Sequence, residues 1–109
     1  MRVISRRRLR LFWETPGCAD ARELLTAWYK TAKLADWAKF ADIKGSFGSV
    51  DKVGSCLVFD IGYNRYRLIV RALFKTHCVY VLRVMTHKEY DKNKWIEQCG
   101  CHDPPPKRK

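Results

Sequence analysis

The fold is decided by residues 56–91, which read CLVFDIGYNRYRLIVRALFKTHCVYVLRVMTHKEYD. β-Branched and aromatic residues are concentrated in three runs of this stretch, a composition that favours β-strands. The three runs are Cys56–Ile61, Tyr66–Phe74 and Cys78–Met85. Residues 62–65 contain a glycine and an asparagine, which tolerate the positive φ of a tight hairpin turn, and residues 75–77 form a second short connection. The stretch therefore predicts two consecutive antiparallel hairpins.

Side chains alternate between the two faces of a strand, and the second run divides cleanly under this rule. One predicted face is wholly apolar and consists of Tyr66, Leu68, Val70, Ala72 and Phe74. The other face consists of Arg67, Ile69, Arg71 and Leu73. We expect helices to cover the apolar face and the arginine face to be an open, cationic surface.

The pairing of the strands follows from the length of the turns. A symmetric second turn pairs Phe74 with Cys78. The partners across these strands are then Arg71 with Val81, Ile69 with Arg83, and Arg67 with Met85, while the first hairpin pairs Asp60 with Arg67. His87 continues the alternation past Met85. The predicted register therefore places Arg67, Arg71 and Arg83 on one face together with His87 and Asp60.

Helices are predicted before this stretch. Arg2–Ile4 suits a short strand, and Ser5 is a suitable N-cap for a helix over Arg6–Glu14, whose arginines Arg6, Arg7, Arg8 and Arg10 we interpret as a solvated face. The clearest helical periodicity covers Ala19–Lys33, with apolar residues at Ala21, Leu24, Leu25, Trp28 and Ala32. A third helix is predicted over Asp36–Ala41, followed by a loop over residues 43–55. These elements predict an α+β fold with N-terminal helices packed on one face of a mainly antiparallel sheet.

Length and composition limit the possible functions. The 109 residues suit one domain, expected over residues 1–98 and followed by a disordered tail over residues 99–109. A net charge of +11 favours an anionic partner such as nucleic acid. No apolar run approaches the length of a membrane span and no signal-peptide core begins the chain, so we expect a cytoplasmic protein.

The cysteines point to a reducing compartment. Their number, five, is odd, which favours free thiols over a disulfide framework. The sequence Cys99-Gly100-Cys101-His102 lacks a second ligand pair at the spacing of a structural zinc site, so no metal is predicted.

Three segments together carry a resemblance to a known family. They are MRVIS (residues 1–5), VFDIGYNRYRLI (residues 58–69) and MTHKEYDK (residues 85–92), and they resemble the HigB family of type II toxin–antitoxin toxins within the RelE superfamily. The likeness extends to about Trp95, and it departs at Gly62-Tyr63-Asn64, where relatives commonly have Gly-Gly-Asn. It implies a small RelE-like fold, an endoribonuclease that cleaves mRNA, often on translating ribosomes, and neutralisation by a HigA-type helix-turn-helix antitoxin.

The resemblance also implies roles for particular residues. It assigns catalysis to His87, Arg67 and Tyr90, and RNA binding to Arg71, Arg83, Lys88 and Asn64. No cofactor is expected, because RNA can be cut by its own 2′-hydroxyl when a base, an acid and cations surround the phosphate. An imidazole can act as acid or base, and guanidinium groups bind phosphate oxygens well. Two alternatives remain open: a non-catalytic module that binds RNA or the ribosome, and a protein whose positive surface binds an acidic partner.

Overall fold

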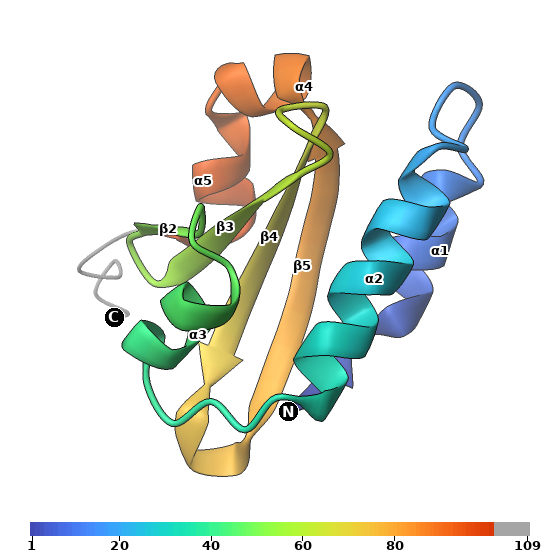
Figure 1. The fold of residues 1–109 in the computed structure, drawn as a ribbon. Coiled ribbons are helices and arrows are strands. Elements are labelled where there is room, and N and C mark those ends of the chain that lie inside the picture. The colour runs from blue at the N-terminus through green and yellow to red at the C-terminus, as the bar shows by residue number, and fades with distance from the viewer. Residues whose placement is uncertain (102–109) are drawn as a thin grey trace.

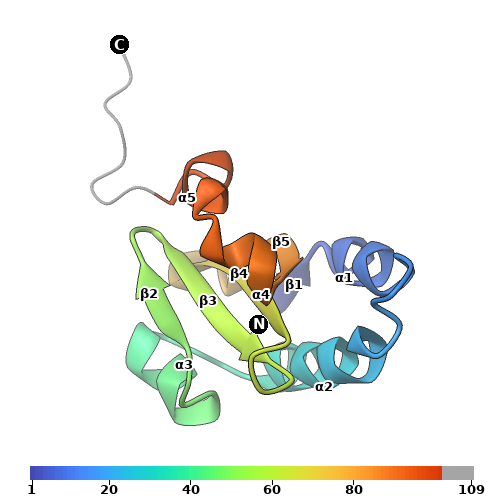
Figure 2. The same ribbon diagram turned by 90° about the horizontal axis from the view of Figure 1, so that it is seen from above.

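A computed structural model describes residues 1–101 as one five-stranded sheet with helices on both faces (Figure 1). The strand order is β1-β5-β4-β3-β2. In chain order, the elements are β1 (Arg2–Ile4), α1 (Arg6–Trp13), α2 (Ala21–Leu34), α3 (Phe40–Ser46), β2 (Asp51–Val53), β3 (Cys56–Ile61), β4 (Tyr66–Leu73), a 3₁₀ turn (Phe74–Thr76), β5 (Cys78–Thr86), α4 (His87–Asp91) and α5 (Lys94–Gln98). The view from above shows α2 and α3 on one side of the sheet and α5 on the other (Figure 2). No helix within residues 1–101 has the length and apolar character needed to cross a membrane.

The predicted α+β class and the two hairpins are confirmed. β2, β3, β4 and β5 are antiparallel neighbours, and β1 adds to the free edge of β5 in parallel. The sheet is therefore mainly antiparallel, with its two longest strands, β4 and β5, at its centre.

The predicted register is correct for the β3–β4 pair and for β4 from Arg67 to Ile69, and it is wrong for β4 from Val70 to the turn before β5. Asp60 pairs with Arg67, Arg67 with Met85, and Ile69 with Arg83, as expected. The 3₁₀ turn lengthens the connection, however, so that Leu73 instead of Phe74 pairs with Cys78, and Arg71 pairs with Tyr80 instead of Val81. A bulge beside Ile69 and Val70 absorbs the one-residue difference, because β5 has an extra residue there.

The segment between α2 and β3 differs from the prediction. The third helix spans Phe40–Ser46 instead of Asp36–Ala41, and the expected loop contains strand β2. Ile43 is fully buried at the centre of this helix, while the carboxylate of Asp42 accepts a hydrogen bond from the Ala38 backbone N–H at 2.9 Å. Trp37 is buried in the extended segment before the helix, and its indole N–H donates to Ser46 Oγ at 3.1 Å.

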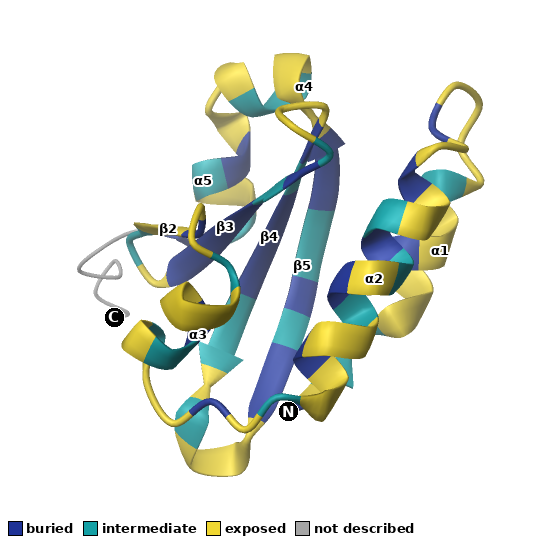
Figure 3. Ribbon diagram, in the orientation of Figure 1, coloured by how far each residue is buried: buried dark blue, intermediate teal, exposed yellow. Residues whose placement is uncertain are grey.

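The apolar face of β4 forms the main core, as predicted. Tyr66, Leu68 and Val70 are buried there, in one cluster with Leu25 and Trp28 of α2. Figure 3 shows buried positions along β3 and β4 and on the side of α2 that faces the sheet. Ala72 and Phe74, at the end of the predicted face, are only partly buried.

The opposite face is not the open cationic surface that was expected. A second core lies there and consists of Cys56, Val58, Ile69, Met85, Trp95 and Cys101. Trp95 comes from α5, and Cys101 comes from the segment expected to be disordered. Residues 99–101 are thus packed against the sheet; the remainder of the predicted tail, residues 102–109, lies outside the described residues.

The expectation that all cysteines are free thiols is also wrong. Cys56 and Cys101 form a disulfide, with their Cα atoms 5.2 Å apart, whereas Cys18, Cys78 and Cys99 are free. Packing of residues 99–101 on the sheet brings these two cysteines, 45 positions apart in sequence, within disulfide distance. A count of cysteines could not reveal that contact.

Candidate active site

The candidate site lies where the β3–β4 turn meets α4. His87 was expected to extend β5, but the strand ends at Thr86, and His87 is the first residue of α4. Thr86 caps this helix by accepting a hydrogen bond from the Glu89 backbone N–H at 3.3 Å. The His87 backbone N–H donates to the Arg65 carbonyl at 3.2 Å, which joins the start of α4 to the turn. Figure 1 shows the β3–β4 turn beside α4. Two of the three segments that resemble the HigB family, residues 58–69 and 85–92, are therefore adjacent in space.

Arg67 is the most strongly anchored charge in the site. Its guanidinium donates to Asp60 Oδ1 at 3.0 Å and to Asn64 Oδ1 at 2.9 Å, and its side chain is only 12% exposed. Asp60 also accepts the Asn64 backbone N–H at 2.7 Å. One carboxylate thus holds both the arginine and the turn, where Tyr63 and Asn64 adopt positive φ angles of 52° and 72°. The predicted pairing of Asp60 with Arg67 accounts for this arrangement.

Tyr90 joins the arginine to the second core. The Arg67 guanidinium carbon lies 5.1 Å from the centre of the Tyr90 ring, and the Trp95 ring stacks on Tyr90 with centroids 5.1 Å apart. The Trp95 indole N–H also donates to the Tyr90 carbonyl at 3.0 Å. Burial raises the pKa of the Tyr90 phenol, and the nearby Arg67 charge opposes this shift. The phenol is therefore protonated at neutral pH and can donate a hydrogen bond or a proton.

His87 is more exposed than Arg67 and is oriented by its own helix. Its Nδ1 lies 3.0 Å from Asp91 Oδ2, four residues later, and 46% of the side chain is exposed. Since Nδ1 is the ring nitrogen next to the carboxylate, Nε2 is the ring nitrogen that lies away from it and can take part in proton exchange. Lys88 is the next residue of α4 and is exposed.

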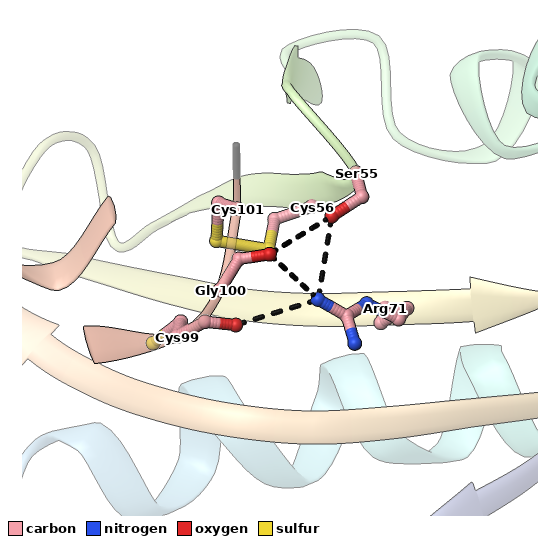
Figure 4. The surroundings of a disulfide bond; sticks show 6 residues. All are labelled: Ser55, Cys56, Arg71, Cys99, Gly100 and Cys101. Carbon is pink, nitrogen blue, oxygen red and sulfur yellow. Dashed lines mark hydrogen bonds between the residues drawn. A yellow bond between two sulfur atoms is a disulfide. The ribbon is translucent and has the colours of Figure 1, made fainter. Parts of the chain in front are cut away.

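The other predicted RNA-binding arginines are bonded to the C-terminal segment. Arg83 donates to Gln98 and lies 3.4 Å from Glu89 Oε1. Arg71 donates to the carbonyls of Gly100, at 3.0 Å, and Cys99, at 3.4 Å, and to Ser55 Oγ at 3.3 Å (Figure 4). Both lie on the predicted face of the sheet, but Arg71 is half-buried, and Arg83, whose side chain is 39% exposed, is bonded to α5 and α4. Their role in RNA binding stays a prediction.

Two features of the site were not predicted from the sequence. The helical start at His87 has a local signal, because Thr86 and Glu89 have the spacing of a capping box. The stacking of Trp95 on Tyr90 has no such signal, since it depends on how α5 turns back over the sheet. Within residues 1–101, the structure has no group of three His, Cys, Asp or Glu side chains that could hold a metal ion.

A cationic concavity lies on α1, a helix that is separate from α4 in both views (Figures 1 and 2). It has a volume of about 240 Å³ and is lined by Arg6, Arg7, Arg10 and Trp13. The three arginines are exposed, and none forms an ion pair with an acidic residue of the described chain. Their charge is therefore uncompensated locally, unlike that of Arg67.

Comparison with known proteins assigns the family. The HigB toxin family, described as the RelE-like toxic component of a toxin-antitoxin system, matches residues 21–93. The chain belongs to this family. The matched region of this HigB-family member runs from α2 through α4, so it includes Arg67, His87 and Tyr90, whereas α1 and α5 lie outside it.

Curated relatives agree with the family assignment. The chain is 33% identical over 70 residues to the mRNA interferase toxin HigB of Escherichia coli K12 and, to the same extent, to the mRNA interferase HigB of Escherichia coli O157:H7 and of Shigella flexneri. The alignment covers 62% of this chain and 67% of each relative.

Proposed function

We propose that this HigB-family toxin is an endoribonuclease that cleaves mRNA without a metal ion. The observation that carries the proposal is the placement of Arg67, Tyr90 and His87 at one end of the sheet, with Arg67 in contact with the Tyr90 ring and His87 oriented by Asp91. The relatives named mRNA interferases support mRNA as the substrate. The net charge of +11 suits a polyanion.

The proposed reaction uses the nucleophile that RNA already has. The 2′-hydroxyl oxygen bonds to the adjacent phosphorus, its proton passes to a base, the bond from phosphorus to the 5′ oxygen breaks, and an acid protonates that oxygen. The products are a 2′,3′-cyclic phosphate and a 5′-hydroxyl. His87 Nε2 is suited to one proton transfer, and the protonated Tyr90 phenol is suited to donate a hydrogen bond or the second proton. Arg67 and Lys88 supply positive charge as negative charge builds on the phosphate.

The partners follow from the same proposal. Translating ribosomes would present the mRNA, and a HigA-type helix-turn-helix antitoxin would neutralise the toxin; both would be met in the cytoplasm. Arg71, Arg83 and Asn64 would contact RNA only where their present hydrogen bonds leave a donor accessible. The proposal therefore places the main phosphate contacts on Lys88 and His87, which are exposed, and on Arg67 only through a guanidinium donor that its bonds to Asp60 and Asn64 leave accessible.

The test is cleavage of mRNA by the purified protein, with and without ribosomes, in buffer containing EDTA. We expect fragments that end in a cyclic phosphate, and we expect His87→Ala to reduce the cleavage rate by about 10²- to 10⁴-fold, as is typical for loss of a general acid or base.

His77→Ala is the matched control, because His77 is also an exposed histidine paired with a carboxylate, Asp36, at 3.3 Å, but lies at the opposite end of β5. Its cleavage rate should equal that of the unmodified protein. If the unmodified protein binds RNA but does not cleave it, either with or without ribosomes, the result would support the non-catalytic binding module instead.

A further inference from the structure

The C-terminal segment of the described chain, residues 94–101, packs on the face of the sheet that carries the candidate site. It lies beyond the region that matches the HigB family, which ends at residue 93. Its central side chain, Trp95, is 2% exposed and belongs to the second core with Cys56 and Cys101. The segment is therefore an integral part of the folded domain.

Trp95 connects this core to the proposed catalytic groups. Its ring stacks on Tyr90 with an interplanar angle of 17°, and its indole N–H donates to the Tyr90 carbonyl. The Tyr90 ring in turn contacts the Arg67 guanidinium. A displacement of Trp95 would thus remove both a side-chain and a backbone contact of Tyr90.

The helices that contain Tyr90 and Trp95, α4 and α5, depend on tertiary contacts for their stability. α4 and α5 have five residues each, and helices of that length are unstable in water without tertiary contacts. Two fastenings follow α5: the Cys56–Cys101 disulfide, and the hydrogen bonds of Arg71 and Ser55 to the Gly100 carbonyl at 3.0 and 3.2 Å (Figure 4). The Cys101 backbone N–H also donates to the Ile96 carbonyl at 2.8 Å, which joins the disulfide directly to α5.

We propose that Trp95, fastened by the Cys56–Cys101 disulfide, is a positioning residue for Tyr90, so that the thiol–disulfide state of this cysteine pair controls the activity of the site. The inference rests on the proposed ribonuclease function and adds a means of regulation to it. The oxidised form has Tyr90 in place against Arg67. The reduced form loses the covalent fastening, and the short helices α4 and α5 open more often.

A dithiol reductant would supply the change. One of its thiolates attacks a sulfur of the Cys56–Cys101 bond, which forms a mixed disulfide and releases the other cysteine as a thiolate that takes up a proton. The second thiol of the reductant then displaces the protein sulfur. Two electrons pass to the protein, which gains two thiols, and the reductant becomes a cyclic disulfide. Because Cys56 and Cys101 are 0% and 1% exposed, the reaction requires residues 99–101 to open first.

The test compares the oxidised protein with Cys101→Ser, which lacks the disulfide, and with Cys99→Ser, which retains it and is the matched control. Amide hydrogen exchange over residues 90–101 measures the fastening, and kcat and KM for RNA cleavage measure its consequence. For Cys101→Ser we expect exchange faster on the order of tenfold and kcat lower on the order of tenfold with little change in KM, because misplacing a reacting group by about 1 Å can cost up to about 10²-fold. Dithiothreitol should convert the unmodified protein to the same behaviour.

Trp95 is tested separately. Trp95→Phe retains an aromatic ring to stack on Tyr90 and should keep most of kcat, whereas Trp95→Leu, which stays apolar, should lower kcat as Cys101→Ser does. Unchanged kcat in Cys101→Ser and in reduced protein would overturn the inference, whether or not exchange becomes faster. Absence of cleavage by the oxidised, unmodified protein would instead overturn the proposed function.

Discussion

At the scale of single residues, the site is organised by carboxylates that orient basic side chains. Asp60 holds Arg67 and the Asn64 backbone, and Asp91 holds His87. The first pair was predictable, because strand alternation and turn length place Asp60 opposite Arg67. The second was predictable only in part: the four-residue spacing suits a helix, but the sequence was interpreted there as an extension of β5. The hydrogen bond from the Glu89 backbone N–H to the Thr86 hydroxyl favours the helix over the strand, since it satisfies one of the N–H groups that have no partner within the first turn of a helix.

Tyr66 and Asp20 form a further oriented pair, which leads to a prediction about pH. The Tyr66 hydroxyl donates to Asp20, and this hydrogen bond, together with burial, raises the pKa of Tyr66 to about 12 from 10.0. A raised pKa means that the folded state favours the protonated phenol. The resulting stabilisation is complete below pH 10 and is lost as the pH rises from 10 to about 12. We expect the free energy of unfolding to fall across this range more steeply in the unmodified protein than in Tyr66→Phe.

Urea denaturation at intervals of pH measures this difference. Tyr63→Phe is the control, because the Tyr63 side chain is 99% exposed and its hydroxyl is solvated in both states. Parallel curves for the unmodified protein and Tyr66→Phe would show that the hydrogen bond to Asp20 does not distinguish the folded from the unfolded state.

At the scale of elements, the long and periodic segments were predictable and the short ones were not. α2 and strands β3 to β5 have strong hydrophobic patterns. β2, by contrast, has only three residues, and two of them, Asp51 and Lys52, are exposed. Its strand conformation therefore depends on backbone pairing with β3, and its own sequence carries no hydrophobic pattern that predicts it. The β4–β5 register from Val70 to the turn was wrong for a similar reason. A 3₁₀ turn and a bulge compensate for one another, and neither has a strong sequence signal.

Helix α1 supports a prediction about RNA affinity. Arg6, Arg7 and Arg10 line one concavity together with Trp13, and guanidiniums without acidic partners among residues 1–101, placed beside an indole, suit the phosphates and a base of single-stranded RNA. Replacing all three with glutamine should weaken RNA binding and lower the slope of log affinity against log salt by about 0.7 for each phosphate that these arginines neutralise. Affinity measured by fluorescence anisotropy at several salt concentrations tests this expectation.

The matched control replaces three exposed lysines elsewhere, Lys39, Lys52 and Lys75, with glutamine. Both triple variants lose the same net charge, so an equal fall in affinity in the two would indicate a general effect of charge and no specific binding at α1. The cleavage rate at saturating RNA should be unaffected by either, because neither set includes a residue proposed to act on the phosphate.

At the scale of the whole molecule, one sheet separates two cores of different origin. The larger core lies under α2 and α3 and was predicted from the apolar face of β4. The smaller one depends on the turn of the chain after β5, on Trp95 and on a disulfide between residues 45 positions apart, none of which local patterns reveal. The arginines that the sequence placed on an open face are therefore arranged around the edge of a core. The packing of residues 94–101 on the sheet decides which of these arginines are accessible, and the alternation of side chains along the strands does not reveal this packing.

Strand β4 contributes to both cores, and this arrangement leads to a prediction about global stability. Val70 faces the larger core and is fully buried, and Ile69 beside it faces the smaller one. Val70→Asp would bury a carboxylate without a partner, which costs several kcal/mol, a large part of the roughly 5–15 kcal/mol that stabilises a typical domain. We expect this variant to be unfolded by circular dichroism at about 25 °C. Leu73→Asp, on the same strand but 43% exposed, should remain folded. A folded Val70→Asp would mean that the helices do not seal this face of the sheet, and the assignment of the main core would have to be abandoned.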